Sequence, residues 1–265
     1  MPGRSILLTG GAGYVGTYLA RRLSALHRVE LLEGDVTAPD LRVPDADVVI
    51  HLAGRLNSFA GSPAEIERIN CGGTINLARR CRPRVHFVFL STDQVFASDP
   101  HRIYTEQDAT APETAYGRSK AMAEDRLLAS LERVAILRTT LLYGYSHPRR
   151  RNTVEFIESK LRAREPVELF SDVLGCPTFI GDLAACVERV VADRIVGIHH
   201  ACGTDLLSRC EIGAALCAAR GYAPGLIHAV RRPASSNLPR RLHLRPAPAF
   251  ADLLVTRLAA WLAAN

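Results

Sequence analysis

The sequence has few features of a disulfide-stabilised, metal-binding or membrane protein. None of its seven cysteines lies in a Cys-x-x-Cys pair or at a Cys/His spacing typical of a metal site, so we interpret them as small buried hydrophobic residues. No apolar run approaches the roughly 18 residues that cross a membrane, and the N-terminal segment has no signal-peptide pattern. We therefore expect a cytoplasmic protein with no metal ion and no membrane partner.

Lysine is nearly absent, although cations are common. Of the 33 lysine and arginine residues, only Lys120 and Lys160 are lysines. Each is a candidate for a role that arginine cannot fill, because only an ammonium is a compact charge whose pKa shifts readily. The formal net charge is +6, but apart from one cluster at residues 149–151 the cations are spread along the chain without interleaved aromatic residues. Nucleic acid is therefore not an expected partner.

Hydrophobic patterning divides the chain into alternating strands and helices. Nearly continuous apolar runs predict buried strands, at residues 6–9, 29–32, 47–52, 85–90, 134–137 and 198–201. Segments of helical periodicity predict helices, at residues 14–26, 63–81, 115–131, 153–163, 182–192, 208–219 and 250–262. Apolar strands that alternate with helices are typical of a parallel sheet covered on both faces, so we expect an α/β fold.

A glycine-rich turn follows the first expected strand. Residues 9–16 read TGGAGYVG and satisfy both G-x-G-x-x-G and G-x-x-G-x-x-G. Either spacing allows a tight turn, close approach of the backbone to a pyrophosphate, and a helix N-terminus whose free N–H groups favour an anion. We therefore assign cofactor binding to five residues of the turn: Gly10, Gly13, Tyr14, Val15 and Gly16.

The position of this turn, between a strand and a helix at the start of the chain, predicts a Rossmann-type doubly wound parallel sheet. Residues 1–145, together with returning elements at 180–200, would form mainly the dinucleotide-binding domain. Residues 146–265 alternate less regularly and predict a small, mixed C-terminal lobe that binds substrate.

A carboxylate about twenty residues after the turn should bind the adenosine ribose of the cofactor. Glu33 and Asp35 both qualify. Glu33 would accept hydrogen bonds from the ribose hydroxyls and disfavour a 2′-phosphate, whereas Asp35 and Val36 would instead flank the adenine. The pattern does not choose between them, so NADPH and NADH both stay open. The short stretch between residues 16 and 51 also indicates that a strand or loop of the usual domain is missing.

A tyrosine and a lysine lie four residues apart on an expected helix. This spacing puts Tyr116 and Lys120 on one helix face, where a nearby ammonium favours the phenolate and makes the phenol a better proton donor. Thr92 follows the strand at residues 85–90, at the carboxyl edge where ligands of such folds bind, and can hydrogen-bond the same substrate oxygen. We interpret the three residues as a catalytic group rather than Tyr116 and Lys120 as a surface pair.

Taken together, these segments resemble the extended short-chain dehydrogenase/reductases. The resemblance covers almost the whole chain: the glycine turn, His51-Leu-Ala-Gly54, Asn70 with Gly72-Gly73-Thr74, Ser91-Thr-Asp-Gln-Val-Phe96, Tyr116-Gly-Arg-Ser-Lys120, and Arg138 leading to Tyr143-Gly144. It implies that Tyr116 is the general acid, that Lys120 holds the nicotinamide ribose and tunes Tyr116, and that Thr92 polarises a ketone. It also implies that the cofactor is lined by Leu52, Ala53, Gly54 and Asn70.

Within that family the chain is most similar to the dTDP-4-dehydrorhamnose reductase group of sugar-nucleotide ketoreductases. The similarity lies in Ser91-Thr-Asp, Gly175-Cys-Pro-Thr178 and residues 197–203, and it implies substrate contacts at Asp93, Gln94 and Thr178. In the related dehydratases a glutamate occupies position 94 and removes a proton, which an amide cannot do. Ketone reduction is therefore favoured. The alternatives are an epimerase, another carbonyl reductase, and a non-catalytic regulatory or binding subunit.

A basic segment follows Tyr143-Gly144 and completes the expected substrate site. Arg149, Arg150, Arg151 and Asn152 come just after the sixth expected strand, and planar guanidinium groups suit phosphate oxygens. We expect Arg149, Arg151 and Asn152 to contact the diphosphate of a nucleotide sugar. The alternative is a solvated basic loop. The oligomeric state expected is a monomer or a homodimer.

Overall fold

Six parallel strands form the central sheet of the computed structural model, which describes residues 3–56, 62–145, 147, 151–236 and 238–265. The strand order is β10-β5-β4-β3-β1-β2, and every neighbouring pair is parallel. The strands are β1 (Ser5–Thr9), β2 (Arg28–Leu31), β3 (Val48–His51), β4 (His86–Thr92), β5 (Val134–Thr139) and β10 (Gly197–His200). The predicted α/β fold with a Rossmann-type parallel sheet is confirmed.

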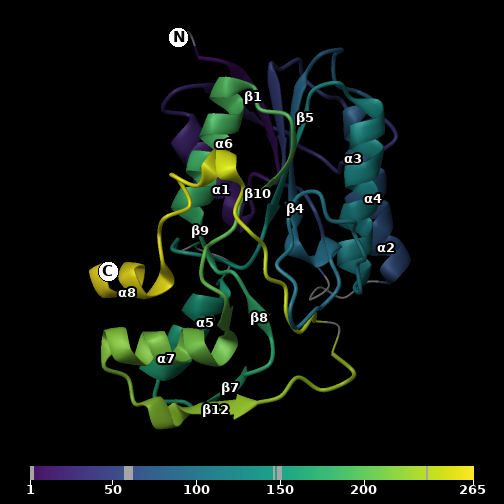
Figure 1. Cartoon of the computed structure of the whole chain (residues 1–265). Coiled ribbons are helices and arrows are strands. Elements are labelled where there is room, and N and C mark those ends of the chain that lie inside the picture. The colour runs from purple at the N-terminus through teal and green to yellow at the C-terminus, as the bar shows by residue number, and fades with distance from the viewer. Residues whose placement is uncertain (1–2, 57–61, 146, 148–150, 237) are drawn as a thin grey trace.

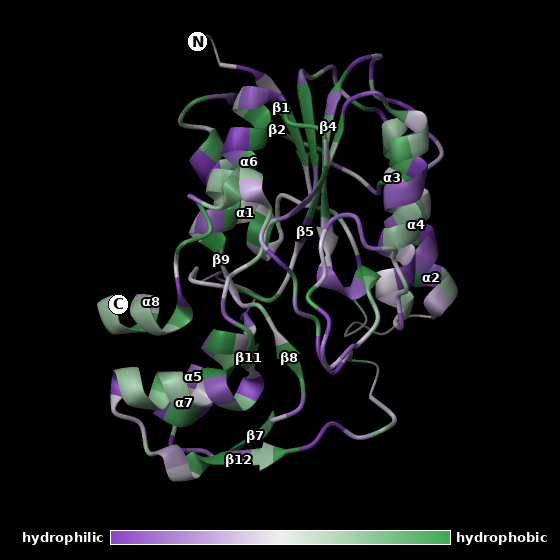
Figure 2. Cartoon of the chain, in the orientation of Figure 1, coloured by the Kyte–Doolittle hydropathy of each residue, from purple (hydrophilic) through white to green (hydrophobic). Residues whose placement is uncertain are grey.

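Helices cover both faces of this sheet (Figure 1). One face carries α1 (Tyr14–Leu23) and α6 (Ile180–Asp193), and the other carries α2 (Pro63–Glu67), α3 (Gly73–Ala78) and α4 (Ala115–Ser130). Side chains alternate between the faces of a strand, so in β1 Ile6 packs with the α1 and α6 side and Leu7 with the other. Figure 2 shows the resulting hydrophobic strands between helices with polar outer surfaces.

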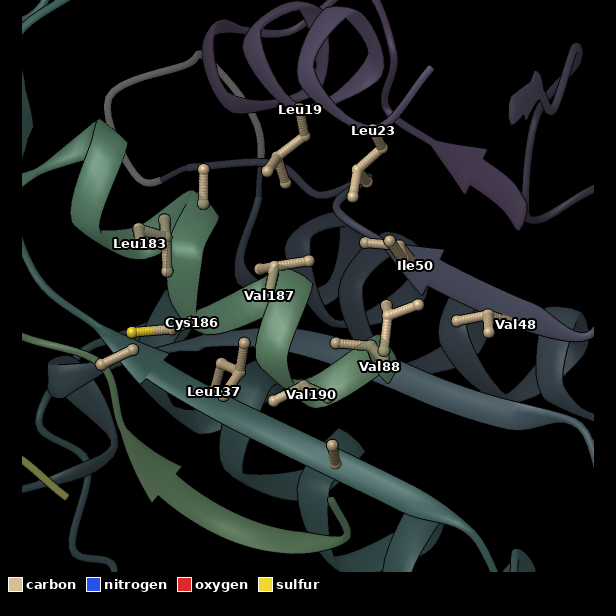
Figure 3. Close-up of a cluster of buried hydrophobic side chains, with 14 of the residues drawn as sticks. Leu19, Leu23, Val48, Ile50, Val88, Leu137, Leu183, Cys186, Val187 and Val190 are labelled. Carbon is tan, nitrogen blue, oxygen red and sulfur yellow. The ribbon is translucent and has the colours of Figure 1, made fainter. Parts of the chain in front are cut away.

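The core beneath α1 and α6 is built from branched aliphatic side chains. Leu19 and Leu23 of α1 and Val187 of α6 pack with Ile50 of β3 and Val88 of β4 (Figure 3). All five are at most 1% exposed. This packing positions the carboxyl ends of β1, β3 and β4, from which the candidate site is built.

The connection between β2 and β3 is short. Residues 32–47, all of which the structure describes, contain no helix and no strand. As a result β2 lies at the edge of the sheet, next to β1. The arrangement agrees with the expected shortening of this region.

The lower part of the molecule in Figure 1 has a mixed composition and its own apolar cluster. Its helices are α5 (Thr153–Arg162), α7 (Arg209–Arg220) and α8 (Leu258–Ala264). Its strands are β7 (Val167–Phe170), β8 (Leu174–Gly175), β11 (Leu207–Ser208) and β12 (Ile227–Val230). β12 pairs with β7 in parallel and β11 pairs with β8 antiparallel, while β6 (Leu142–Tyr143) pairs with β9 (Thr178–Phe179).

Two predicted helices differ from the structure. The segment at residues 63–81 is divided into α2, a π-helical turn (Arg68–Gly72) and α3. The last helix begins only at Leu258, after a 3-10 turn (Pro248–Phe250), because the Asp182 carboxylate accepts hydrogen bonds from the backbone N–H and the hydroxyl of Thr256 and holds that segment out of a helix. No helix among the described residues is long and apolar enough for a membrane span.

A buried ion pair ties α4 to the sheet beneath the candidate site. The Arg138 guanidinium on β5 donates to both carboxylate oxygens of Glu124 on α4, and both side chains are 2% exposed. Ser91 on β4 donates to the same carboxylate. The pair therefore joins β4, β5 and α4.

We expect Glu124→Ala to lower the free energy of unfolding by about 3–5 kcal/mol, because it leaves the Arg138 cation buried without its partner. Urea denaturation measures this loss. Lys160→Ala is the control, since it removes an exposed ion pair to Glu165 and should cost no more than about 1 kcal/mol. Equal losses in the two variants would contradict a structural role for the buried pair.

Candidate active site

The glycine turn joins β1 to α1 and has the geometry of an anion-binding loop. Gly10 has a φ of +69°, and a Cβ there would lie 2.8 Å from the backbone nitrogen of Ala53. A Cβ on Gly16 would overlap the carbonyl oxygen of Gly10. Among the described residues no side chain caps the N-terminus of α1, where Gly13 is the N-cap residue. The first-turn N–H groups, including those of Tyr14 and Val15, are therefore available to a phosphate.

Tyr14 connects this turn to the segment before α5. Its hydroxyl accepts hydrogen bonds from the backbone N–H of Tyr145 (3.2 Å) and from Nδ2 of Asn152 (3.1 Å). Burial raises the pKa of Tyr14 to about 12. Asn152 is the N-cap of α5, and its Oδ1 accepts from the Glu155 N–H. The structure thus places Asn152 beside the glycine turn, with both groups of its amide engaged.

The two candidate ribose ligands differ in their surroundings. The Asp35 carboxylate accepts from the Thr37 N–H at 2.8 Å, which lowers its pKa, and Val36 is buried, so that a Cβ on Gly73 would lie 2.7 Å from its Cγ2. Glu33 is exposed. Within the part of the chain that the structure describes, no hydrogen bond or ion pair engages it. Glu33 thus remains available to a ribose, while Asp35 and Val36 lie in a fixed local turn.

The turn after β3 is held at both ends by side chains. Thr9 Oγ1 accepts from the backbone N–H groups of Leu52 and Ala53. Asn70, in the π-helical turn, accepts from the Arg55 N–H at 2.7 Å and donates to the Arg55 carbonyl. π-helical turns are frequent at functional sites, and here the turn aims the Asn70 amide at the loop.

Gly54 lies where this loop meets Lys120. A Cβ on Gly54 would be 3.2 Å from Oδ1 of Asn70 and 3.9 Å from Nζ of Lys120. Nδ2 of Asn70 also donates to the hydroxyl of Ser119, the neighbour of Lys120. The structure therefore brings together the loop at residues 52–54, Asn70 and Lys120, and their contact with a cofactor stays a prediction.

His51, at the end of β3, belongs to a buried hydrogen-bond chain. Because Thr9 Oγ1 already accepts two N–H groups, its proton points to His51 Nδ1 (2.7 Å), which leaves the Nε2 proton for Thr74 Oγ1 (2.9 Å). Thr74 in turn donates to the Asn70 carbonyl. Burial and the Lys120 cation lower the pKa of His51 to about 3. His51 is thus a neutral structural link between β1, β3 and the π-helical turn.

Thr92 and Tyr116 meet at the carboxyl end of β4. Thr92 is the last residue of β4 and Tyr116 the second of α4, and their side chains form a hydrogen bond. The single hydroxyl proton of Thr92 is donated to Oδ1 of Asp93 at 3.0 Å. The close approach depends on Gly117, where a Cβ would overlap the carbonyl oxygen of Gln94. The predicted pair of hydroxyls at the sheet edge is therefore present.

The remaining side chain of the trio, Lys120, is 3% exposed. Its Nζ lies 4.0 Å from the centre of the Phe89 ring, and burial lowers its pKa to about 7 although the Glu124 carboxylate acts in the opposite direction. Burial and then the Asp93 carboxylate raise the pKa of Tyr116, and the hydrogen bond with Thr92 lowers it. Burial therefore dominates the pKa of Tyr116, and the field of Lys120 acts on His51.

A carboxylate and a guanidinium interact electrostatically beyond Thr92. Burial raises the pKa of Asp93 to about 6, opposed by its hydrogen bond to Thr92 and by the Arg209 guanidinium. Arg209 is the first residue of α7. Sequence reasoning did not single it out, because nothing in the pattern distinguishes it from the other arginines.

The other predicted substrate residues are occupied within the protein. Oε1 of Gln94 accepts from Thr114, the N-cap of α4. Thr178 is fully buried, and its hydroxyl donates to the Cys176 carbonyl and accepts from the Gly203 N–H. The structure does not bring Thr178 to the substrate side.

The structure describes only part of the basic segment. Arg149 and Arg150 lie outside the described residues, and Arg151 is exposed and donates to Ser159 on α5. Contact between this segment and a diphosphate stays a prediction. No group of three or more His, Cys, Asp or Glu side chains that could hold a metal ion occurs among the described residues.

Comparison with known proteins gives the family of the chain. Residues 4–261 match the sequence model described as the RmlD substrate binding domain. The chain belongs to this family. The resemblance to the extended short-chain dehydrogenase/reductases and to their dTDP-4-dehydrorhamnose reductase group is thereby confirmed.

Individual known proteins are moderately similar to the chain. The chain is 30% identical over 258 residues to a dTDP-4-dehydrorhamnose reductase of Mycolicibacterium smegmatis, covering 92% of this chain and 75% of that protein. It is 33% identical over 207 residues to a probable dTDP-4,6-dihydroxy-2-methyloxan-3-one 4-ketoreductase of Streptomyces antibioticus, covering 73% and 68%. A solved dTDP-4-dehydrorhamnose reductase of Bacillus anthracis in complex with NADP shares the fold, with a TM-score of 0.85, 21% identity and coverage of 98% and 97%.

Proposed function

We propose that this protein is an NAD(P)H-dependent reductase that reduces a keto group on a nucleotide-activated deoxysugar. The observation that carries the proposal is the hydrogen-bonded pair Thr92–Tyr116 at the end of β4, with Lys120 buried on the next turn of α4 beside the cofactor-binding loop. Two hydroxyls on one substrate oxygen, with a cation beneath, suit reduction of a ketone. The names of the ketoreductases to which the chain is similar support this assignment.

The described residues fit a dinucleotide cofactor. The uncapped N-terminus of α1 would hold its pyrophosphate, and the loop at residues 52–54, Asn70 and Lys120 would hold the nicotinamide half. The bound cofactor would supply a hydride to the carbonyl carbon. Residues 1–145 and 180–200 would then mainly serve the cofactor, and the rest of residues 146–265 mainly the sugar nucleotide.

Three side chains would complete the reduction. Tyr116 is protonated at neutral pH, because burial raises its pKa, so it can donate its proton to the carbonyl oxygen as negative charge develops there. Thr92 would turn its hydroxyl proton from Asp93 to the same oxygen. With the cofactor bound, the Lys120 ammonium would stabilise the phenolate that remains on Tyr116, although in the structure its field acts on His51 and not on Tyr116.

Gln94 separates this proposal from dehydration. Its amide cannot remove a ring proton, and its oxygen accepts the Thr114 hydroxyl at the start of α4. In this protein the side chain therefore orients the helix that carries Tyr116.

The proposal is tested by following oxidation of NADPH and NADH with a panel of keto-sugar nucleotides. We expect turnover with at least one 4-keto deoxysugar nucleotide and formation of the corresponding alcohol. Cofactor binding without turnover on any member would favour a regulatory subunit. Interconversion of sugar stereoisomers without net cofactor oxidation would favour an epimerase.

We expect Glu33 to influence the choice of cofactor. If its exposed carboxylate accepts from the ribose hydroxyls, Glu33→Gln removes its repulsion of a 2′-phosphate, and the affinity for NADPH relative to NADH should rise about three- to ten-fold. Fluorescence titration of both cofactors measures the ratio. The control is Glu30→Gln, which removes an exposed carboxylate on β2, three residues before Glu33. If the ratio of the NADPH and NADH affinities is the same in Glu33→Gln as in the wild type, Asp35 is the ribose ligand instead.

A further inference from the structure

Arg209 is a charged side chain near the candidate site that the mechanism above leaves unused. It is partly buried at the start of α7, and burial lowers its pKa. In the described part of the chain, no hydrogen bond or ion pair engages its guanidinium. A guanidinium stays protonated and has five N–H groups that need acceptors. A ligand with oxygen acceptors would satisfy them.

The strand pair β8–β11 places Arg209 opposite Asp93. Leu207 of β11 pairs with Gly175 of β8, and a Cβ on Gly175 would lie 4.0 Å from Oδ2 of Asp93. The β8–β11 pair therefore lies against Asp93 at Gly175. Arg209 begins α7 directly after β11, and its guanidinium lowers the pKa of Asp93.

Gly175 keeps the space between the two charges open. Its φ is not in the left-handed region, and among the described residues Asp93 Oδ2 is the only heavy atom that an added Cβ would approach, at 4.0 Å. Neither backbone conformation nor close packing requires a glycine here. The charge of each of these two residues, Asp93 and Arg209, affects the pKa of the other. Within the described residues, however, no ion pair joins them. The two groups thus flank a gap.

This gap adjoins the reacting hydroxyls. Asp93 follows Thr92 directly, and Thr92 hydrogen-bonds both Asp93 and Tyr116. A carboxylate accepts hydrogen bonds and a guanidinium donates them, a combination that suits neighbouring hydroxyl and ring oxygens of a sugar. A diphosphate in the same place would bring its negative charge close to the Asp93 carboxylate. Burial already disfavours the charged form of that carboxyl group.

We propose that Arg209 and Asp93 together bind the sugar ring of the substrate, the guanidinium donating to a sugar oxygen and the carboxylate accepting from an adjacent hydroxyl. Arg209 is then a specificity-determining residue that the sequence motifs do not include. The inference rests on the proposed function and deepens it.

The test compares Arg209→Gln, Arg209→Lys and Gly175→Val with the wild type in the cofactor-loaded enzyme. Loss of a charged hydrogen bond in Arg209→Gln should raise the KM for the keto-sugar nucleotide about 10- to 100-fold. Gly175→Val should raise it by filling the gap. The inhibition constant of the free nucleoside diphosphate and the Kd for NAD(P)H should not change. The control is Arg162→Gln, an exposed arginine of α5, which should behave as wild type.

Each other outcome has a definite meaning. An unchanged KM in Arg209→Gln with an active wild type overturns the inference and leaves the proposed function intact. An inhibition constant for the nucleoside diphosphate that rises in parallel with KM assigns Arg209 to the phosphates and overturns the sugar assignment. A wild type inactive on every keto-sugar nucleotide overturns both. Circular dichroism establishes folding, and Arg209→Lys and Gly175→Val decide the question if Arg209→Gln does not fold.

Discussion

Replacing Tyr116 by phenylalanine is expected to lower kcat by about two to four orders of magnitude, the range for removal of a general acid. The substitution deletes one oxygen at the end of a partly buried ring, so packing at the start of α4 is kept. Its hydrogen bond to Thr92 is lost, and with it the proton for the carbonyl oxygen. Cofactor affinity should change little, because the cofactor-binding groups lie on the glycine turn, the loop at residues 52–54 and Lys120. Steady-state kinetics and cofactor titration measure the two effects.

A second tyrosine gives a matched control for this variant. Tyr222, in the lobe that carries α7, donates its hydroxyl proton to Glu158, so Tyr222→Phe also removes one hydroxyl and one hydrogen bond. It should retain wild-type turnover. Wild-type turnover in Tyr116→Phe would remove Tyr116 from the reaction, and a similar loss in both variants would indicate a general effect of stability rather than of proton transfer.

The inner strands of the central sheet were predictable because they are buried on both faces. β3 and β5 are buried along their whole length, and such strands appear in the sequence as continuous apolar runs. The two-residue strands β6, β8, β9 and β11 were not predicted, because two residues are too few to show a period. Their pairing depends on contacts between segments far apart in the sequence, such as Leu207 with Gly175.

The candidate site was predictable where its residues share a local pattern. Tyr116 and Lys120 lie on one helix, and the glycine turn lies between a strand and a helix, so spacing alone indicates their relation. The two residues that flank the gap, Asp93 and Arg209, lie more than a hundred positions apart in the sequence. The occupied amide of Gln94 and the buried hydroxyl of Thr178 depend likewise on partners from other segments, which no spacing reveals.

Replacing Lys120 by arginine is expected to keep the charge and still weaken cofactor binding about 10- to 100-fold. Lys120 is 3% exposed, with its Nζ between the Phe89 ring, Gly54 and Asn70. A planar guanidinium is larger than an ammonium, and overpacking at such a position costs about 1–3 kcal/mol. Equilibrium titration with NAD(P)H measures the loss, and circular dichroism establishes that the variant is folded.

The pH dependence of kcat/KM distinguishes the charge of Lys120 from its shape. Burial lowers the pKa of Lys120 to about 7, so the ammonium is present below that pH and is lost as the pH rises through it. If the cation is needed, activity of the wild type should fall on the basic side of about pH 7. An arginine stays protonated throughout, so this basic limb should disappear in Lys120→Arg even though its activity is lower.

The other lysine gives the control, because Lys160 is exposed and paired with Glu165, and Lys160→Arg should keep both the basic limb and the cofactor affinity. The same profile and cofactor affinity in Lys120→Arg as in the wild type would show that Lys120 serves neither the cofactor nor Tyr116.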